Sequence, residues 1–267
     1  MIIRYTKAHG ARNDFLLTWR EGVELADLPA AARAICDRHT GVGADGWLLV
    51  DRATAQADGA IVLYNSDGSL AEISGNGTRC AAAFLIEAGL AGEDVKIATG
   101  AGVKLLRTLE RRGRRFQFDM NMGRPYYSEK DIRFRLELAG GVREVAILNV
   151  GNPQCAMFVE RFDLDWRTLG REMETHPHFP NRTNVSFVRV ADRHTIETRF
   201  WERGAGETLS SGTGSTGAAA AAMARGLVES PVTVLTPAGP LEIRQENDDL
   251  FLAGPAEIVA AGEFYRE

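Results

Sequence analysis

The chain has 267 residues, with 31 Lys and Arg against 36 Asp and Glu, which gives a net charge of −5. This length allows one large domain or two of ordinary size. Charges of both signs are mixed along the chain and leave no basic face for nucleic acid. The longest apolar run, 218–224, is far shorter than the roughly 20 residues that cross a bilayer. We therefore expect neither a nucleic-acid nor a membrane partner.

In chain order, the first half alternates β-rich runs with helical segments. Strands are predicted at 2–5, 15–19, 47–50, 60–64, 95–98, 103–109 and 115–121, and helices at 29–37 and from Ser74 onward. The second half repeats this style. Strands are predicted at 133–138, 142–150, 156–159, 184–190, 195–201, 232–235, 241–245 and 250–253, and helices at 166–175 and from Ser211 onward. Residues 121–125 are the predicted linker.

An internal repeat supports a division into two halves. Residues 74–90 align without gaps with 211–227, and Ser211 lies 137 residues after Ser74. Each copy has a Gly-rich turn, an Ala-rich run of good helix formers, and a closing glycine, Gly89 or Gly226, as a helix C-cap. Such a helix has no polar face, so we expect it at the centre of its domain with sheet around it. The repeat predicts two domains, and we expect them at 1–121, joined by a C-terminal strand 254–267, and at 122–253.

The two Gly-rich turns are candidate anion sites, because a helix N-terminus presents unpaired N–H groups and the positive end of a dipole. If the halves face each other, a carboxylate bound between two such helices would have Ser74 and Ser211 on opposite sides of its neighbouring carbon. That geometry suits an isomerase acting on an acidic α-carbon. A single turn of this kind is more simply explained by helix entry and close packing, and the matching pair favours the functional interpretation.

Seven motifs in order give the chain a resemblance to the diaminopimelate epimerase family, cofactor-independent isomerases of lysine and peptidoglycan precursor synthesis. They are residues 7–15, 41–46, 65–72, 75–80, 151–153, 182–184 and 202–209. The resemblance implies an α/β (α+β) fold of two pseudo-symmetric domains, each a rolled mixed sheet around a central helix, with the active site in a cleft between them. It also implies a homodimer and an amino-acid substrate.

No cofactor or metal is expected. The Gly-rich turns lack the P-loop lysine and the Gly-x-Gly-x-x-Gly spacing of dinucleotide sites. The three cysteines, Cys36, Cys80 and Cys155, are scattered and match neither a disulfide framework nor a zinc site. Segment 1–7 has the pattern of an opening strand without an apolar signal core, so we expect a cytoplasmic protein.

Three departures from the family fall on its proton-transfer groups. Family members have cysteine where this chain has Ser74 and Ser211, and one thiolate removes the α-proton while the opposite thiol returns one. They also commonly have histidine where this chain has Gln154. Because an alcohol ionises far less readily than a thiol, another base is needed. Glu202 is our candidate, with Glu72 and Asp67 as weaker ones.

The residues that would hold an amino acid are present. The resemblance implies that the distal amino and carboxylate groups of the substrate are bound by Asn13, Asn65, Asn152, Asn184 and Arg203. It implies that the reacting α-carboxylate receives backbone donors from Gly75, Asn76, Gly212 and Thr213. A planar guanidinium suits a carboxylate, and amides offer both donors and acceptors.

Three explanations of the two serines remain at this point. The chain is a diverged isomerase of diaminopimelate or a related amino acid, with reduced or altered activity; or an amino-acid binding protein of the same fold; or an engineered Cys-to-Ser epimerase. Gln154 counts against the engineered form, because trapping a ligand needs no change there. We place the diverged isomerase first.

Overall fold

The computed structural model describes residues 1–266, which form two compact units. Unit 1 comprises Met1–Met120 together with the chain from Gly254 onward, and unit 2 comprises Asn121–Ala253. Each unit is a mixed sheet rolled around one central helix, as the sequence predicts. Within the described residues, no helix is both long and apolar enough to cross a membrane.

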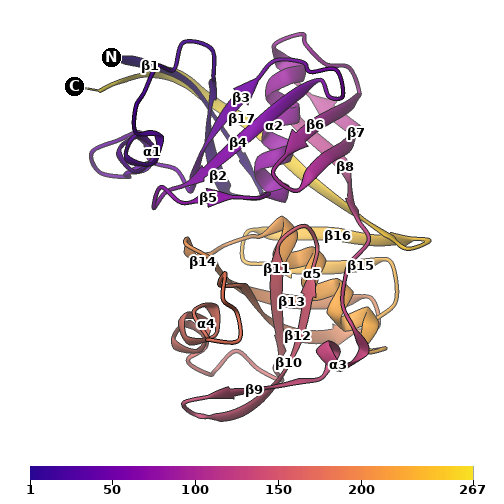
Figure 1. Cartoon of the computed structure of the whole chain (residues 1–267). Coiled ribbons are helices and arrows are strands. Elements are labelled where there is room, and N and C mark those ends of the chain that lie inside the picture. The colour runs from indigo at the N-terminus through magenta and orange to yellow at the C-terminus, as the bar shows by residue number, and fades with distance from the viewer. Residues whose placement is uncertain (267) are drawn as a thin grey trace. The chain divides into compact units, whose positions relative to one another are not determined.

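In unit 1, eight strands close into a ring around helix α2 (Gly75–Glu87) (Figure 1). The strands are β1 (Ile2–Gly10), β2 (Asn13–Trp19), β3 (Gly46–Asp51), β4 (Gly59–Asn65), β6 (Asp94–Thr99), β7 (Gly102–Arg112), β8 (Arg115–Gly123) and the C-terminal part of β17 (Asp249–Tyr265). Neighbours pair in that order, and β17 pairs with both β8 and β1. Pairs β2–β3 and β4–β6 are parallel. Helix α1 (Leu28–Cys36) packs on β3 and β4, and the two-residue β5 (Leu70–Ala71) pairs with β4.

Unit 2 repeats this pattern around helix α5 (Gly212–Ala224). Its strands are β9 (Phe134–Leu138), β10 (Gly141–Asn149), β11 (Pro153–Phe158), β12 (Asn184–Asp192), β13 (Thr195–Glu202), β15 (Val232–Thr236), β16 (Gly239–Glu246) and the first residues of β17, paired in that order. Pairs β11–β12 and β13–β15 are parallel. Helix α4 (Trp166–Glu174) packs on β12 and β13, and β14 (Gly206–Thr208) pairs with β13.

The central helices are buried because their small side chains let strands approach on every side. All residues of α5 from Gly212 to Ala222 are buried, and so is α2 from Gly75 to Leu85. Both helices end in the same motif. The N–H of Leu90 donates to Leu85 O at 2.9 Å, and that of Leu227 to Ala222 O at 2.9 Å.

The glycines before these leucines, Gly89 and Gly226, have φ of +71° and +69°. This left-handed conformation closes the motif and favours glycine. The sequence therefore locates both helix ends correctly.

Several elements differ from the sequence expectation. Strand β1 runs on to Gly10, because its second half pairs with both β2 and β17. The short β5, β14 and helix α3 (Glu129–Ile132) carry too few residues to show a period. The predicted linker is partly strand: β8 continues to Gly123, and Tyr126 exchanges backbone hydrogen bonds with Asn149 at 2.9 Å. The predicted strand 250–253 and the C-terminal strand form the single strand β17, and the final residue, 267, lies outside the described residues.

Candidate active site

Helices α2 and α5 begin at the two serines singled out by the sequence. Ser74 and Ser211 are N-caps with nearly identical extended backbones, φ −128° and ψ 121° against φ −133° and ψ 122°. Each hydroxyl accepts a hydrogen bond from the N–H three residues on, at 3.0 Å in both units. A Cβ on Gly214 would lie 2.8 Å from the Ser211 hydroxyl, so only glycine leaves room for this cap. The repeat thus encodes one cap geometry twice.

In unit 2 the capping serine also contacts a carboxylate. The buried Ser211 hydroxyl donates to Glu202 Oε2 at 2.7 Å. The other carboxylate oxygen of Glu202 accepts from Thr208 Oγ1 at 2.6 Å, which fixes its orientation. Glu202 is the last residue of β13, and the β13–β14 hairpin carries it to the start of α5. The Ser211 proton therefore lies within transfer distance of a fixed carboxylate.

A second cluster in unit 2 consists of buried amides. Asn152 Nδ2 donates to Thr213 Oγ1 at 3.2 Å, and Asn152 Oδ1 accepts from Gln154 Nε2 at 2.7 Å. A Cβ on Gly217 would lie 2.9 Å from Gln154 Cγ, so the glutamine packs directly on α5. Within residues 1–266, Gln154 Oε1 is buried and has no hydrogen-bond partner. It is a buried acceptor available to a ligand or a water molecule.

The third group in unit 2 joins the start of β12 to the β13–β14 turn. Asn184 Oδ1 accepts from the Arg203 backbone N–H at 3.0 Å, and Asn184 Nδ2 donates to Pro153 O at 3.1 Å. The Arg203 side chain donates to Asn181 O at 3.2 Å. Asn152 and Asn184 each use one N–H and one carbonyl lone pair within the protein, so each keeps one donor and one acceptor for a ligand.

Unit 1 has a corresponding network at the start of α2. Asn76 Nδ2 donates to Asn13 Oδ1 at 3.1 Å, and Asn13 Nδ2 donates to Asp45 Oδ2 at 2.7 Å. The fully buried Arg79 donates to Asn76 Oδ1 and, through Nε, to Pro255 O at 3.1 Å. Burial lowers the pKa of Arg79 to about 10, which leaves it charged at neutral pH. The network connects Asn13 and Asn76 to the C-terminal strand.

Asn65 is the last residue of β4, directly before the turn that follows this strand. Its Nδ2 donates to Ser69 Oγ at 3.0 Å. Asp67, one of the weaker base candidates, accepts from the Ser69 backbone N–H at 2.8 Å and from its hydroxyl at 2.6 Å, an ordinary turn role. Glu72, the other weaker candidate, is exposed just before α2.

Sequence reasoning missed the residue that gathers these unit 1 segments. Asp45 accepts from Asn13, from the Asp14 backbone N–H at 3.1 Å and from Arg38 Nη2 at 2.7 Å, and its own C=O accepts from Ser66 N–H at 3.0 Å. It therefore links the β1–β2 turn, the end of α1 and the turn after β4. The motif at 41–46 contained the signal, although its partners lie far away in the sequence.

The three cysteines are free and buried. Burial raises the pKa of Cys36 and of Cys80 to about 12, and it raises the pKa of Cys155 as well. None of these thiols is ionised at neutral pH, so none can replace a thiolate base.

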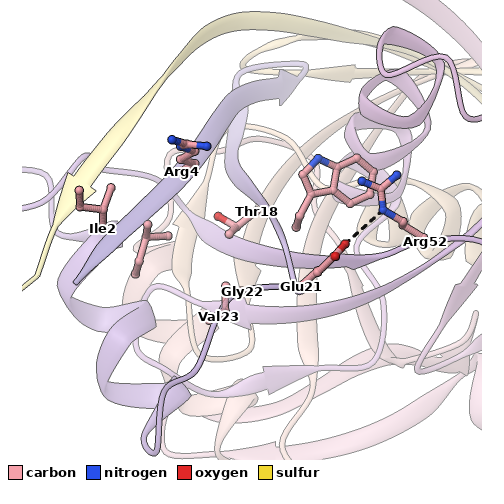
Figure 2. Close-up of a pocket in the computed structure, with 9 residues that line it drawn as sticks. Ile2, Arg4, Thr18, Glu21, Gly22, Val23 and Arg52 are labelled. Atoms are coloured by element: carbon pink, nitrogen blue, oxygen red, sulfur yellow. Dashed lines mark hydrogen bonds and ion pairs between the residues drawn. The ribbon is translucent and has the colours of Figure 1, made fainter.

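A cavity of about 410 Å³ in unit 1 contains none of the predicted site residues (Figure 2). Its wall includes Arg52, whose guanidinium lies 5.0 Å from the centre of the Trp19 ring and 3.4 Å from Glu21. These side chains pair with one another along the cavity wall, and the Trp19 ring also packs against Phe84 of α2, with 4.6 Å between the ring centres.

The sequence matches the model of the family described as "Diaminopimelate epimerase" over residues 5–128 and 145–259. Curated relatives span nearly the whole chain. The diaminopimelate epimerase of Pelotomaculum thermopropionicum is 39% identical, with 98% of this chain and 99% of the relative covered. That of Moorella thermoacetica is 38% identical with the same coverage.

Solved structures with the same fold are more distant in sequence. A hydroxyproline epimerase from Agrobacterium vitis has a TM-score of 0.76 at 14% identity, covering 98% of this chain and 90% of that one. A phenazine biosynthesis protein of the PhzF family from Bacillus anthracis has a TM-score of 0.71 at 15% identity, covering 98% and 99%. At these identities the likeness concerns the fold alone.

Proposed function

This chain belongs to the diaminopimelate epimerase family, a family of isomerases, and we propose that it inverts an amino-acid α-carbon, with a serine–carboxylate pair in place of a thiol. The observation that carries the proposal is the 2.7 Å hydrogen bond from the Ser211 hydroxyl to Glu202. The substrate proposed is diaminopimelate or a related amino acid, the class on which the named relatives act.

In the proposed reaction, the substrate α-carboxylate receives N–H donors from Gly75 and Asn76 and from Gly212 and Thr213. Negative charge that develops on loss of the α-proton is stabilised by these helix N-termini. Glu202 is the base, and it takes the proton either directly or through the Ser211 hydroxyl, whose proton it already accepts. Ser74 stands at the equivalent position of the first helix and is the proposed donor of the other proton; solvent then returns a proton to Ser74 and takes one from Glu202.

The remaining side chains hold the far end of the substrate. Arg203 offers a guanidinium to a carboxylate, and Asn152 and Asn184 each offer the N–H that they do not use within the protein. Asn13 and Asn65 are the corresponding amides of unit 1. Gln154 contributes its open Oε1, an acceptor suited to a substrate ammonium.

The proposal is tested by α-proton exchange. The protein is incubated with LL- and meso-diaminopimelate in deuterated water, and loss of the α-proton signal is followed by NMR for the native chain and for Ser74→Cys/Ser211→Cys. Exchange by the native chain that is lost in Glu202→Gln supports the serine–carboxylate base. Because a thiol ionises near neutral pH, the double cysteine form is expected to exchange faster.

The other outcomes point away from the native chain as a catalyst. If the native chain shows no α-proton exchange and the double cysteine form does, the result contradicts the serine–carboxylate base and indicates an amino-acid binding protein of this fold. If neither form shows α-proton exchange and calorimetry detects no binding, the result contradicts diaminopimelate as the ligand.

The homodimeric state and the cytoplasmic location belong to the same proposal. Sedimentation at several protein concentrations is expected to give twice the mass of one chain. A mass of one chain at all concentrations contradicts the dimer without affecting the proposed chemistry.

A further inference from the structure

Glu174, the last residue of α4, is a buried carboxylate that the sequence did not single out. It is 3% exposed. Its Oε2 accepts from Trp201 Nε1 at 2.8 Å, while its Oε1 accepts from the Gly204 backbone N–H at 2.8 Å and from the Arg182 guanidinium. Three donors from three separate positions therefore converge on one side chain.

These donors lie on the segments that carry the proposed site of unit 2. Trp201 and Gly204 flank Glu202 and Arg203 on either side, so Glu174 fixes the chain before and after the proposed base. On the other side, the Glu174 carbonyl oxygen accepts from the Thr183 N–H at 3.2 Å, directly before Asn184. Glu174 itself belongs to neither segment, and it joins them from a helix on the outside of the sheet.

Unit 1 contains a bridge of the same kind with its charges reversed. Asp45 and Arg182 are 137 residues apart, the offset of the internal repeat, and each precedes the strand that follows the outer helix. Asp45 pairs with Arg38, which follows α1, whereas Arg182 pairs with Glu174, at the end of α4. Both units therefore have an acid–base pair between the end of the outer helix and the chain before the next strand, with the signs exchanged.

We propose that Glu174 is a positioning residue that holds the β13–β14 turn so that the Glu202 carboxylate meets the Ser211 hydroxyl. This inference rests on the proposed function. Glu174 touches neither Ser211 nor the proposed substrate groups, and it acts through the Trp201 indole and the Gly204 backbone N–H on either side of Glu202 and Arg203.

Glu174→Gln tests the role with almost no change in size. An amide has one acceptor oxygen, so its NH₂ must face a donor, either Trp201 Nε1 or the Gly204 N–H and Arg182. The turn is expected to shift and kcat for α-proton exchange to fall roughly 10- to 100-fold. Glu207→Gln is the matched control. It removes an exposed ion pair between Glu207 of β14 and Arg167 of α4, the helix that also carries Glu174, and it leaves the Glu174 contacts to Trp201 and Gly204 in place.

A double-mutant comparison separates positioning from a general loss of stability. If Glu174 acts through Glu202, Glu174→Gln lowers kcat little further in a Glu202→Gln background. An equal loss of kcat in both backgrounds overturns the inference. The comparison is made in Ser74→Cys/Ser211→Cys, because the native chain is expected to lose exchange when Glu202 is replaced.

A readout independent of activity keeps the inference testable if neither form exchanges, a result that would count against the proposed function alone. Hydrogen–deuterium exchange followed by mass spectrometry is expected to show faster uptake over residues 202–206 in Glu174→Gln than in the native chain or in Glu207→Gln. Unchanged uptake in that segment overturns the positioning role. Faster uptake throughout unit 2 also overturns it, because that result indicates global destabilisation.

Discussion

Asp14 and Asp45 lie side by side, yet their pKa values move in opposite directions. Burial acts to raise the pKa of both carboxyl groups. For Asp14, hydrogen bonds from Arg38 and Lys7 outweigh burial and hold its pKa below the ordinary value. For Asp45, burial and the neighbouring charge of Asp14 raise the pKa above the ordinary value. The β1–β2 turn that carries Asn13 is therefore held by an ionised Asp14.

The lowered pKa of Asp14 predicts a pH dependence of stability. A carboxyl whose pKa is lower in the folded state stabilises the fold above its unfolded pKa of about 3.9, and this contribution is lost as the pH falls through the folded pKa. Asp14→Asn is thus expected to lower the free energy of unfolding at pH 7, by an amount that shrinks below about pH 4. Urea denaturation at pH 7, 5 and 3 checks this.

The control for this series is Asp163→Asn, which removes an exposed carboxylate paired only with the nearby Arg161. It should change the unfolding free energy little at any of these pH values. If Asp14→Asn lowers the free energy of unfolding by the same amount at pH 7 and at pH 3, the prediction is contradicted.

At the scale of the element, the helix ends are determined by a few adjacent residues. Gly89 and Gly226 both have positive φ, and nothing lies within 4 Å of a Cβ placed on either. A substitution there therefore costs backbone strain and no steric clash. Gly92 has equally open space without a positive φ, which makes it a matched control.

Gly89→Ala and Gly226→Ala are each expected to lower the free energy of unfolding by about 1–2 kcal/mol, the cost of a left-handed non-glycine residue. Gly92→Ala is expected to be neutral or slightly stabilising, because alanine reduces the freedom of the unfolded chain. Chemical denaturation of the three variants measures the difference. Equal stability of all three would show that φ at the helix ends carries no cost.

At the scale of the whole molecule, unit 1 is completed by the last strand of the chain. Strand β17 pairs with β1 over Ile2 to His9 and also with β8. Its Pro255 carbonyl accepts from the buried Arg79, which in turn orients Asn76. The first α2 turn of unit 1 thus depends on residues at the opposite end of the sequence.

Deletion of residues 254–267 is therefore expected to open the unit 1 ring and leave the buried Arg79 without its carbonyl acceptor. Residues 1–120 should lose protection in hydrogen–deuterium exchange, while 121–253 keep more of theirs, because the β16–β17 pairing ends at Ala253. Undiminished protection in 1–120 would contradict the structural role given to β17.

The sequence alone determined the features that depend on near neighbours. The Ser-Gly-x-Gly turns, the alanine runs and the glycines at 89 and 226 predict both central helices, their caps and the duplication, because caps and helical periods act over a few residues. The same local motifs carry the resemblance to the family. These motifs contain both Ser211 and Glu202, whose hydrogen bond is a feature of the tertiary structure.

Only the tertiary structure decided which distant groups complete these motifs. Glu174 at the end of α4 and Pro255 in β17 give no local signal, and the 41–46 motif that contains Asp45 does not show which distant groups Asp45 binds. Their partners lie tens to hundreds of residues away and are brought together by ring closure and strand pairing. Neighbouring residues thus determine where the two helices begin, whereas packing across the sheet determines how the side chains around those helix starts are oriented.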